Sequence, residues 1–198
     1  MGVKVKNIWL HFRKIQTHRK WVRHYCFAIG LYKQGLLHDL SKYSPTEFWE
    51  SVKYYRGTSS PIEASKAKNG YSLAWFHHRG RNLHHHVTWI DNFDETGGTP
   101  ILMPYKYFAE MICDFLAAGR AYQGKKFNFI AEHKWWFNKK SKGVAMPKNE
   151  IAMIDFIFGE LAEKEAALGP KKAEEWAITG GLKYLIETTY KAYRNRVM

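Results

Sequence analysis

Residues 7–31 read NIWLHFRKIQTHRKWVRHYCFAIGL. Close to the 3.6-residue period of an α-helix, apolar side chains recur at Ile8, Phe12, Ile15, Val22, Cys26 and Ile29. The spacing predicts a long amphipathic helix with one stripe against a core. On the same helical wheel His18 lies at the edge of this stripe, His24 points roughly away from it, and His11 falls within it two turns earlier. We therefore expect His18 to face the core, His24 to face solvent, and His11 to lie in the core or at its rim.

Helix signals continue along the chain, and strand signals are sparse. Ser44-Pro-Thr-Glu47 has the form of a capping box with proline at the first helical position, and Ser60-Pro-Ile-Glu63 repeats it with Gly70 as a stop. Further helical patterns are indicated at 36–40, 104–122, 149–168, 171–178 and 182–198. The sequence predicts an all-α protein in a single domain, 1–198, with a helical core at about 7–124 and a C-terminal helical extension at about 147–198.

The composition is that of a basic globular protein. Lys and Arg outnumber Asp and Glu by 31 to 18, and the resulting net charge of +13 favours anionic partners such as phosphorylated metabolites or nucleic acid. The only two cysteines, Cys26 and Cys113, fall within apolar helical patterns, so we expect buried thiols rather than a disulfide. There is no signal-peptide pattern and no apolar run of membrane-spanning length, so we expect a cytoplasmic protein without a membrane partner.

Histidine is the residue type that most needs an explanation. Five of the ten histidines lie between 77 and 86, and neutral imidazole is the commonest biological metal ligand. His38-Asp39 lies in the apolar segment 36–40, and Asp114 lies in the middle of the apolar run 108–118. Burying carboxylates in such surroundings is costly unless a cation or a polar network satisfies them. The sequence therefore indicates a metal site; a solvated histidine loop and a salt bridge from Asp114 to Arg120 or Arg194 are the competing interpretations.

The order of these candidates resembles a known superfamily. Their order resembles the pattern of the HD-domain metal-dependent phosphohydrolases: first His18, then His38-Asp39, then paired histidines and finally Asp114. Lys42, three residues after Asp39, matches the His-Asp-x-x-Lys form of some branches. The segments THRK (17–20), HDLSKYSP (38–45) and HHRGRN (77–82), with His84-His85, are closer still to an uncharacterised bacterial family of HD-like proteins.

The resemblance implies an HD-domain-like helical bundle that binds one or two divalent transition metals (Mn, Fe, Co, Ni or Zn). It implies a first metal on His18, His38, Asp39 and Asp114, and a second on His78 and His85, with His77 and His84 as neighbours or alternates. Water activated by metal would attack a phosphate ester, whose oxygens Lys42, Arg79 and Arg81 would grip while Asn82 positions the substrate. For Lys42, a salt bridge to Glu47 is the competing interpretation. His86 receives no role, and the oligomeric state stays open.

Three further functions remain compatible with the sequence. Some HD-like proteins use two irons to activate oxygen, which makes a di-iron oxygenase the first of them. The basic, aromatic segment EHKWWFNKKSK (132–142) and the net charge support a nucleic-acid-binding helical protein as the second. For that segment, the competing interpretation is a helix that packs its tryptophans inward. A purely structural metal site is the third.

Overall fold

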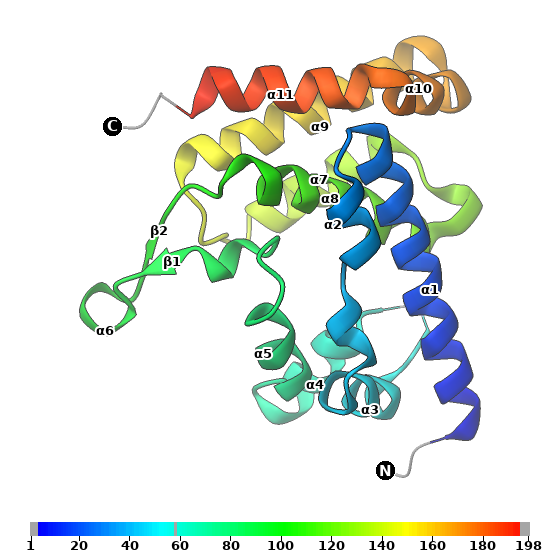
Figure 1. Cartoon of the computed structure of the whole chain (residues 1–198), viewed down its shortest axis with the longest axis vertical. Helices are drawn as coiled ribbons and strands as arrows, with labels where there is room; N and C mark the ends of the chain where they lie inside the picture. Colours follow the sequence, from blue (N-terminus) through cyan, green and yellow to red (C-terminus); the bar gives the residue numbers. More distant parts are fainter. Residues whose placement is uncertain (1–3, 58, 195–198) are drawn as a thin grey trace.

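The computed structural model describes residues 4–57 and 59–194, and these are mostly helical, as the sequence predicts (Figure 1). In chain order the α-helices are α1 (Val5–Ala28), α2 (Tyr32–Leu37), α3 (Pro45–Tyr54), α4 (Pro61–Asn69), α5 (Leu73–Arg79), α6 (Phe93–Thr96), α7 (Tyr105–Gln123), α8 (Phe129–Lys140), α9 (Lys148–Leu168), α10 (Pro170–Trp176) and α11 (Leu182–Tyr193). Short 3-10 helices span Leu40–Tyr43, His86–Thr88 and Gly124–Lys126, and a π-helical turn spans Ala177–Gly181. Strands β1 (Ile90–Asp91) and β2 (Thr99–Pro100) pair antiparallel around α6.

The core forms where α1 packs along α7. The inward stripe of α1 supplies Val22 and Cys26, and α7 supplies Ile112 and Leu116, all with no exposed surface. The same hydrophobic cluster continues into α8, α9 and α11, so the C-terminal helices cover the α1–α7 pair (Figure 1). Cys26 and Cys113 are both buried and free, as predicted.

Helix α2 returns along α1 at very short range. A Cβ atom placed on Gly35 would lie 2.9 Å from Cβ of Cys26 and 3.2 Å from Cα of Arg23, so only glycine allows this approach. The turn before α2 contains Gly30, whose φ of 83° suits glycine. Because α2 runs back beside α1, the residue that follows it, His38, comes to lie next to His18.

The segment 36–40 is not the continuous helix that the sequence predicts. Helix α2 ends at Leu37, and Asp39 takes the left-handed conformation (φ 56°, ψ 25°) before the 3-10 helix at Leu40–Tyr43. Leu37 and Leu40 are 52% and 46% exposed, whereas His38 and Asp39 are almost fully buried. The turn, rather than the apolar neighbours, therefore carries the His-Asp pair into the interior; aspartate is among the residues that tolerate this conformation.

The capping signals are partly confirmed. Ser44 accepts a hydrogen bond from the backbone N–H of Glu47 at 3.4 Å and begins α3, and Gly70 ends α4 with a φ of 78°. Ser60 precedes α4 but makes no side-chain cap bond. The carboxylate of Glu47 does not return to the start of its own helix and instead contacts histidines of α5.

The basic, aromatic segment 132–142 covers most of α8 and the turn that follows it. Trp136 is completely buried and donates its indole N–H to Asp155 at 2.6 Å, whereas Trp135 and Phe137 stay exposed.

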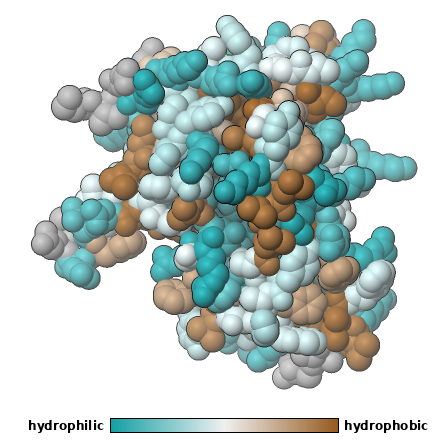
Figure 2. Space-filling model, viewed as in Figure 1, coloured by the Kyte–Doolittle hydropathy of each residue, from teal (hydrophilic) through white to brown (hydrophobic). Residues whose placement is uncertain are grey.

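On the face shown in Figure 2, hydrophobic side chains form small patches separated by hydrophilic ones. Within residues 4–57 and 59–194, no helix combines the length and the hydrophobicity needed to span a bilayer.

Candidate metal centre

Four side chains from three parts of the fold converge beside α1. His18 comes from the middle of α1, His38 and Asp39 from the turn after α2, and Asp114 from the middle of α7. Nε2 of His18 lies 3.3 Å from Nε2 of His38, 3.4 Å from Oδ2 of Asp39 and 3.1 Å from Oδ1 of Asp114. Nε2 of His38 lies 3.3 Å from Oδ2 of Asp39 and 3.5 Å from Oδ1 of Asp114. We call these four residues the first group.

These separations fit metal coordination better than hydrogen bonding. With metal–ligand distances of about 2.1 Å, neighbouring ligand atoms lie about 3.0 Å apart in an octahedron and about 3.4 Å apart in a tetrahedron. The five separations given above, each of which involves Nε2 of His18 or His38, run from 3.1 to 3.5 Å. Each Nε2 atom carries at most one proton yet faces three nitrogen or oxygen atoms of the group, so hydrogen bonds alone leave some of these approaches unpaired.

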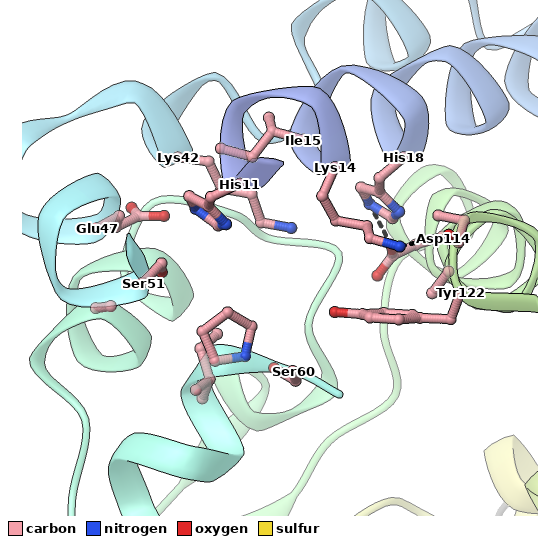
Figure 3. A pocket seen from close by; sticks show the side chains of 15 residues that line it. His11, Lys14, Ile15, His18, Lys42, Glu47, Ser51, Ser60, Asp114 and Tyr122 are labelled. Carbon is pink, nitrogen blue, oxygen red and sulfur yellow. Dashed lines mark hydrogen bonds and ion pairs between the residues drawn. The ribbon is translucent and has the colours of Figure 1, made fainter. Parts of the chain in front are cut away.

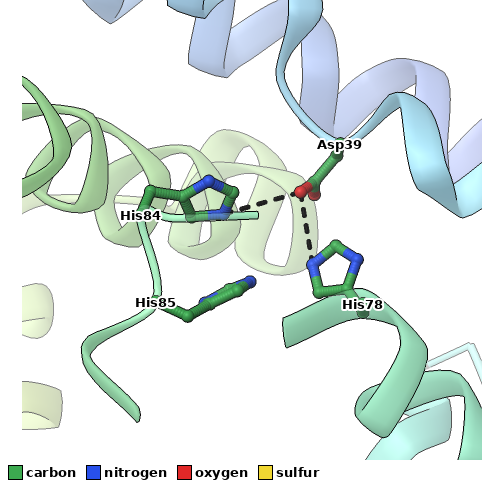
Figure 4. A group of neighbouring side chains, drawn as sticks. All are labelled: Asp39, His78, His84 and His85. Carbon is green, nitrogen blue, oxygen red and sulfur yellow. Dashed lines mark ion pairs between the residues drawn. The ribbon is translucent and has the colours of Figure 1, made fainter. Parts of the chain in front are cut away.

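A second group shares Asp39 with the first. Oδ1 of Asp39 lies 3.3 Å from Nε2 of His78 and 3.5 Å from Nε2 of His84, and the His85 ring stands beside them (Figure 4). One ligand atom from each of these four residues falls within 4.8 Å of the others. Among the described residues, Oδ1 of Asp39 and Nε2 of both His84 and His85 are buried without a hydrogen-bond partner. Unpaired buried polar atoms are uncommon, and an ion between them would satisfy all three.

Two glutamates orient the histidines. Oε1 of Glu110, one turn before Asp114 on α7, accepts hydrogen bonds from Nδ1 of His38 at 2.8 Å and Nδ1 of His84 at 3.2 Å. Oε2 of Glu47 accepts from Nδ1 of His78 at 2.7 Å. A proton held on Nδ1 leaves the lone pair on Nε2, the atom that faces the two groups. His38, His84 and Glu110 also lie close enough to hold an ion themselves, but these hydrogen bonds explain their contact.

The buried carboxylates of Asp39 and Asp114 in the first group require a positive charge nearby. Burial alone would raise the pKa of Asp39 and of Asp114, but the surrounding histidines hold both pKa values well below the usual range, and Lys42 does the same for Asp39. Burial alone would lower the pKa of His38, but Asp39, Asp114 and Glu110 raise it well above the usual value. In the absence of a metal, a proton therefore supplies the positive charge that the carboxylates require.

The histidines of the second group differ from one another in pKa. Burial alone would lower the pKa of His78, but Asp39 and Glu47 raise it. Burial and the neighbouring imidazoles lower the pKa of His84 and lower that of His85 well below its usual value. Both rings are therefore neutral at physiological pH, which is the form that binds a metal ion.

Lys42 reaches the first group. Its Nζ lies 2.5 Å from Oδ2 of Asp39, and it does not pair with Glu47, the salt-bridge partner that the sequence suggested. Burial alone would lower the pKa of Lys42, but Asp39 and Asp114 raise it, so the side chain keeps its charge. Asp114 likewise faces histidines, whereas Arg120 pairs with Glu174.

A cavity of about 230 Å³ opens onto the first group (Figure 3). His18, Asp114 and Lys42 line it, and it continues along α1 past Lys14 to His11. Nζ of Lys14 donates to the backbone carbonyl of Ala121 at 2.8 Å. A small molecule can therefore approach the first group through a passage that carries two ammonium groups.

The other residues predicted to contact substrate lie outside this cavity. Asn82 donates to the backbone carbonyl of His78 at 2.7 Å and to Ser41 at 2.8 Å, which makes it a brace for His78. Arg79 and Arg81 line a separate surface hollow with Phe76, and Arg81 also contacts the backbone carbonyl of His77. A role for these arginines in substrate binding stays a prediction.

The remaining histidines have separate roles. Nδ1 of His77 donates to Oε1 of Glu47 at 2.6 Å, which places it beside the second group as a neighbour. His86 turns away and donates from Nδ1 to the backbone carbonyl of Ala145 at 3.2 Å; burial and the nearby Lys139 lower its pKa to about 4. His24 is half-buried rather than fully exposed, because it lies 3.6 Å from Glu174.

Sequence patterns did not assign Glu47 or Glu110 to the metal centre, and they left His84 only as a neighbour or alternate. Glu47 reads as the acid of a capping box, which concealed its contact with His77 and His78. Glu110 carried a usable signal, because it precedes Asp114 by four residues and so shares its helix face. Helical periodicity could not show which of His84 and His85 faces Asp39, because both lie in a turn and both approach its carboxylate.

Fold and site together define a mostly helical protein with buried His, Asp and Glu groups that could hold a metal ion. Residues 7–159 match the model of a family described as a family of unknown function (DUF5662), and the chain belongs to this family. No curated protein and no solved structure matches the chain.

Proposed function

We propose that this protein is a metal-dependent phosphohydrolase that acts on a phosphate ester. The observation that carries the proposal is the position of Asp39. Its two carboxylate oxygens face different histidine groups, and its neighbour Lys42 brings a fixed positive charge to the same point. Metal ions held by these two groups, next to the ammonium group of Lys42 and the cavity, would suit phosphoryl chemistry.

The ligands divide between two ions. His18, His38, Asp39 and Asp114 would hold the first, and Asp39, His78, His84 and His85 would hold the second. The mixed nitrogen and oxygen ligands suit Mn, Fe, Co, Ni or Zn. Such ions, when bound, activate water and offset charge on phosphoryl oxygens. The order of the first four ligands along the chain supports the resemblance to the HD-domain superfamily.

The protein's own residues bind and orient the ester. Lys42 lies beside Asp39 at the cavity wall and would contact a non-bridging oxygen, since an ammonium is a strong donor to phosphate. Glu110 and Glu47 hold three of the imidazoles by their Nδ1 atoms. This bracing keeps the Nε2 atoms in place while the ester binds.

Elemental analysis of the purified protein tests the proposal, with Asp39→Asn beside the wild type. We expect about two equivalents of transition metal in the wild type, loss of both in Asp39→Asn, and no change in Asp94→Asn, which alters an exposed carboxylate on α6. The metal-loaded wild type should hydrolyse phosphate monoesters and lose this activity on chelation. A folded wild type that binds no metal after reconstitution would refute the proposal, and metal without turnover would favour a structural site.

A di-iron oxygenase and a nucleic-acid-binding protein differ from a phosphohydrolase in what they require around the site. A di-iron oxygenase would use the same ligands, but the cavity ammonium groups of Lys14 and Lys42 favour an anionic substrate. A mixed-valent iron signal in spin resonance would reverse this preference.

Nucleic-acid binding would rest on the exposed Trp135 and Phe137, since Trp136 belongs to the core. Steeply salt-dependent retention of oligonucleotides would support that function.

A further inference from the structure

The cavity is longer than a phosphate group requires. His18 and His11 both line it from α1 and are seven residues apart, which corresponds to about 10 Å along the helix axis. Figure 3 shows His18 and Asp114 of the first group toward one side of this space and the His11 ring toward the other. A ligand whose phosphate lies at the first group would therefore extend along α1 for roughly two helical turns.

His11 is a buried polar side chain without a partner. It is 6% exposed, and neither ring nitrogen has a hydrogen-bond partner among the described residues. Phe48 and Tyr55 pack against its ring at centroid distances of 5.4 and 5.7 Å, which fixes its position. Leaving two ring nitrogens buried and unpaired is costly unless a bound molecule satisfies one of them.

The two ends of the cavity present different chemical groups. Burial and the charge of Lys42 lower the pKa of His11 to about 4, so its ring is neutral and offers one donor and one acceptor. The wall between the ends is largely apolar and includes Ile15, Ile62 and Ala121. The cavity therefore runs from the first group, past the ammonium groups of Lys42 and Lys14 and a largely apolar wall, to the neutral ring of His11.

We propose that His11 is a specificity-determining residue that hydrogen-bonds the far, uncharged end of an elongated phosphate monoester bound in this cavity. The inference rests on the proposed function for the position of the phosphate. It adds the chemical form of the ester group, which has an extended apolar body and ends in a neutral hydrogen-bonding function such as a hydroxyl or an amide.

Non-hydrolysable phosphonates test the inference by equilibrium binding to the metal-loaded protein. Octylphosphonate and 8-hydroxyoctylphosphonate differ only in the terminal hydroxyl, and methylphosphonate reports on the phosphate end alone. We expect the terminal hydroxyl to tighten binding to the wild type by about tenfold, the effect of a hydrogen bond to a buried unpaired group. In His11→Phe, which keeps an aromatic ring but removes both nitrogens, the gain should vanish while methylphosphonate binding is unchanged.

His24→Phe is the matched control, because it makes the same change on another face of α1 and should keep the wild-type preference. If His11→Phe fails to fold, His11→Gln serves instead; it keeps a donor and an acceptor and should retain part of the hydroxyl gain. Equal binding of the two octyl compounds to the wild type would overturn the inference, and so would equal loss of all three ligands in a folded His11 variant. Failure of every phosphonate, methylphosphonate included, to bind the metal-loaded protein would refute the proposed function and this inference with it.

Discussion

Oε1 of Glu110 lies 2.8 Å from Nδ1 of His38, on the other side of the imidazole ring from the nitrogen that faces Asp39 and Asp114. The same oxygen accepts from Nδ1 of His84, so one carboxylate on α7 aims a histidine into each of the two groups. Such bracing selects the tautomer whose Nε2 lone pair is free and raises its basicity.

Glu110→Gln should weaken metal binding without removing a ligand. The amide carries no charge and donates as well as accepts, so it would hold His38 and His84 less firmly. We expect an affinity about 10- to 100-fold lower, measured by competition with a chromophoric chelator. Glu132→Gln, a change at a buried glutamate of α8 that accepts from Gln123, is the control and should not alter affinity. An unchanged affinity in Glu110→Gln would contradict the bracing role.

His18→Ala and His85→Ala should each lose one metal ion and keep the other. Each histidine belongs to one group only, whereas Asp39 belongs to both. Elemental analysis after gel filtration should give about one equivalent for either histidine variant. If His85→Ala loses both equivalents, the two groups do not bind independently, and a single shared site would be the better description.

Gly35→Ala should disturb the centre from a distance. The added methyl group would meet Cβ of Cys26 and Cα of Arg23, neither of which can swing aside, so α2 must move away from α1. His38 and Asp39 follow α2 directly and would move away from His18. We expect reduced metal content with near-normal helicity by circular dichroism. Gly159→Ala, in the middle of α9 with no atom near the new methyl group, should bind metal normally and be equally or more stable.

Stability should fall between about pH 4.5 and 7 because of Glu150. Burial raises the pKa of this carboxyl to about 7, although Oε2 accepts from the backbone N–H of Met103 at 3.1 Å. In that interval the unfolded chain has released the proton that the folded chain keeps, so rising pH favours unfolding, by up to about 3 kcal/mol in total. Glu150→Gln removes this contribution. In denaturant titrations at pH 5 and pH 8, the stability of Glu150→Gln relative to wild type should increase at the higher pH; parallel pH profiles would show that Glu150 ionises normally.

Much of the architecture and most of the candidate ligands could be predicted from sequence. Helical periodicity indicated α1 and α7, and the position of His18 on the helical wheel placed it toward the core, where it lies. An aspartate inside an apolar helix signalled Asp114, because burying a carboxylate is costly without a partner. These features are local: each depends on which way a side chain points from a single helix.

The tertiary structure alone decided how the ligands are shared. The close approach at Gly35 sets His38 beside His18, and the left-handed turn at Asp39 directs its two oxygens to different histidines. Neither event has a sequence period, because both depend on how segments distant in the chain pack together. For the same reason the sequence predicted a helix across Asp39, assigned Glu47 to a cap, and left His11 at the core or its rim without showing the cavity that its ring nitrogens face.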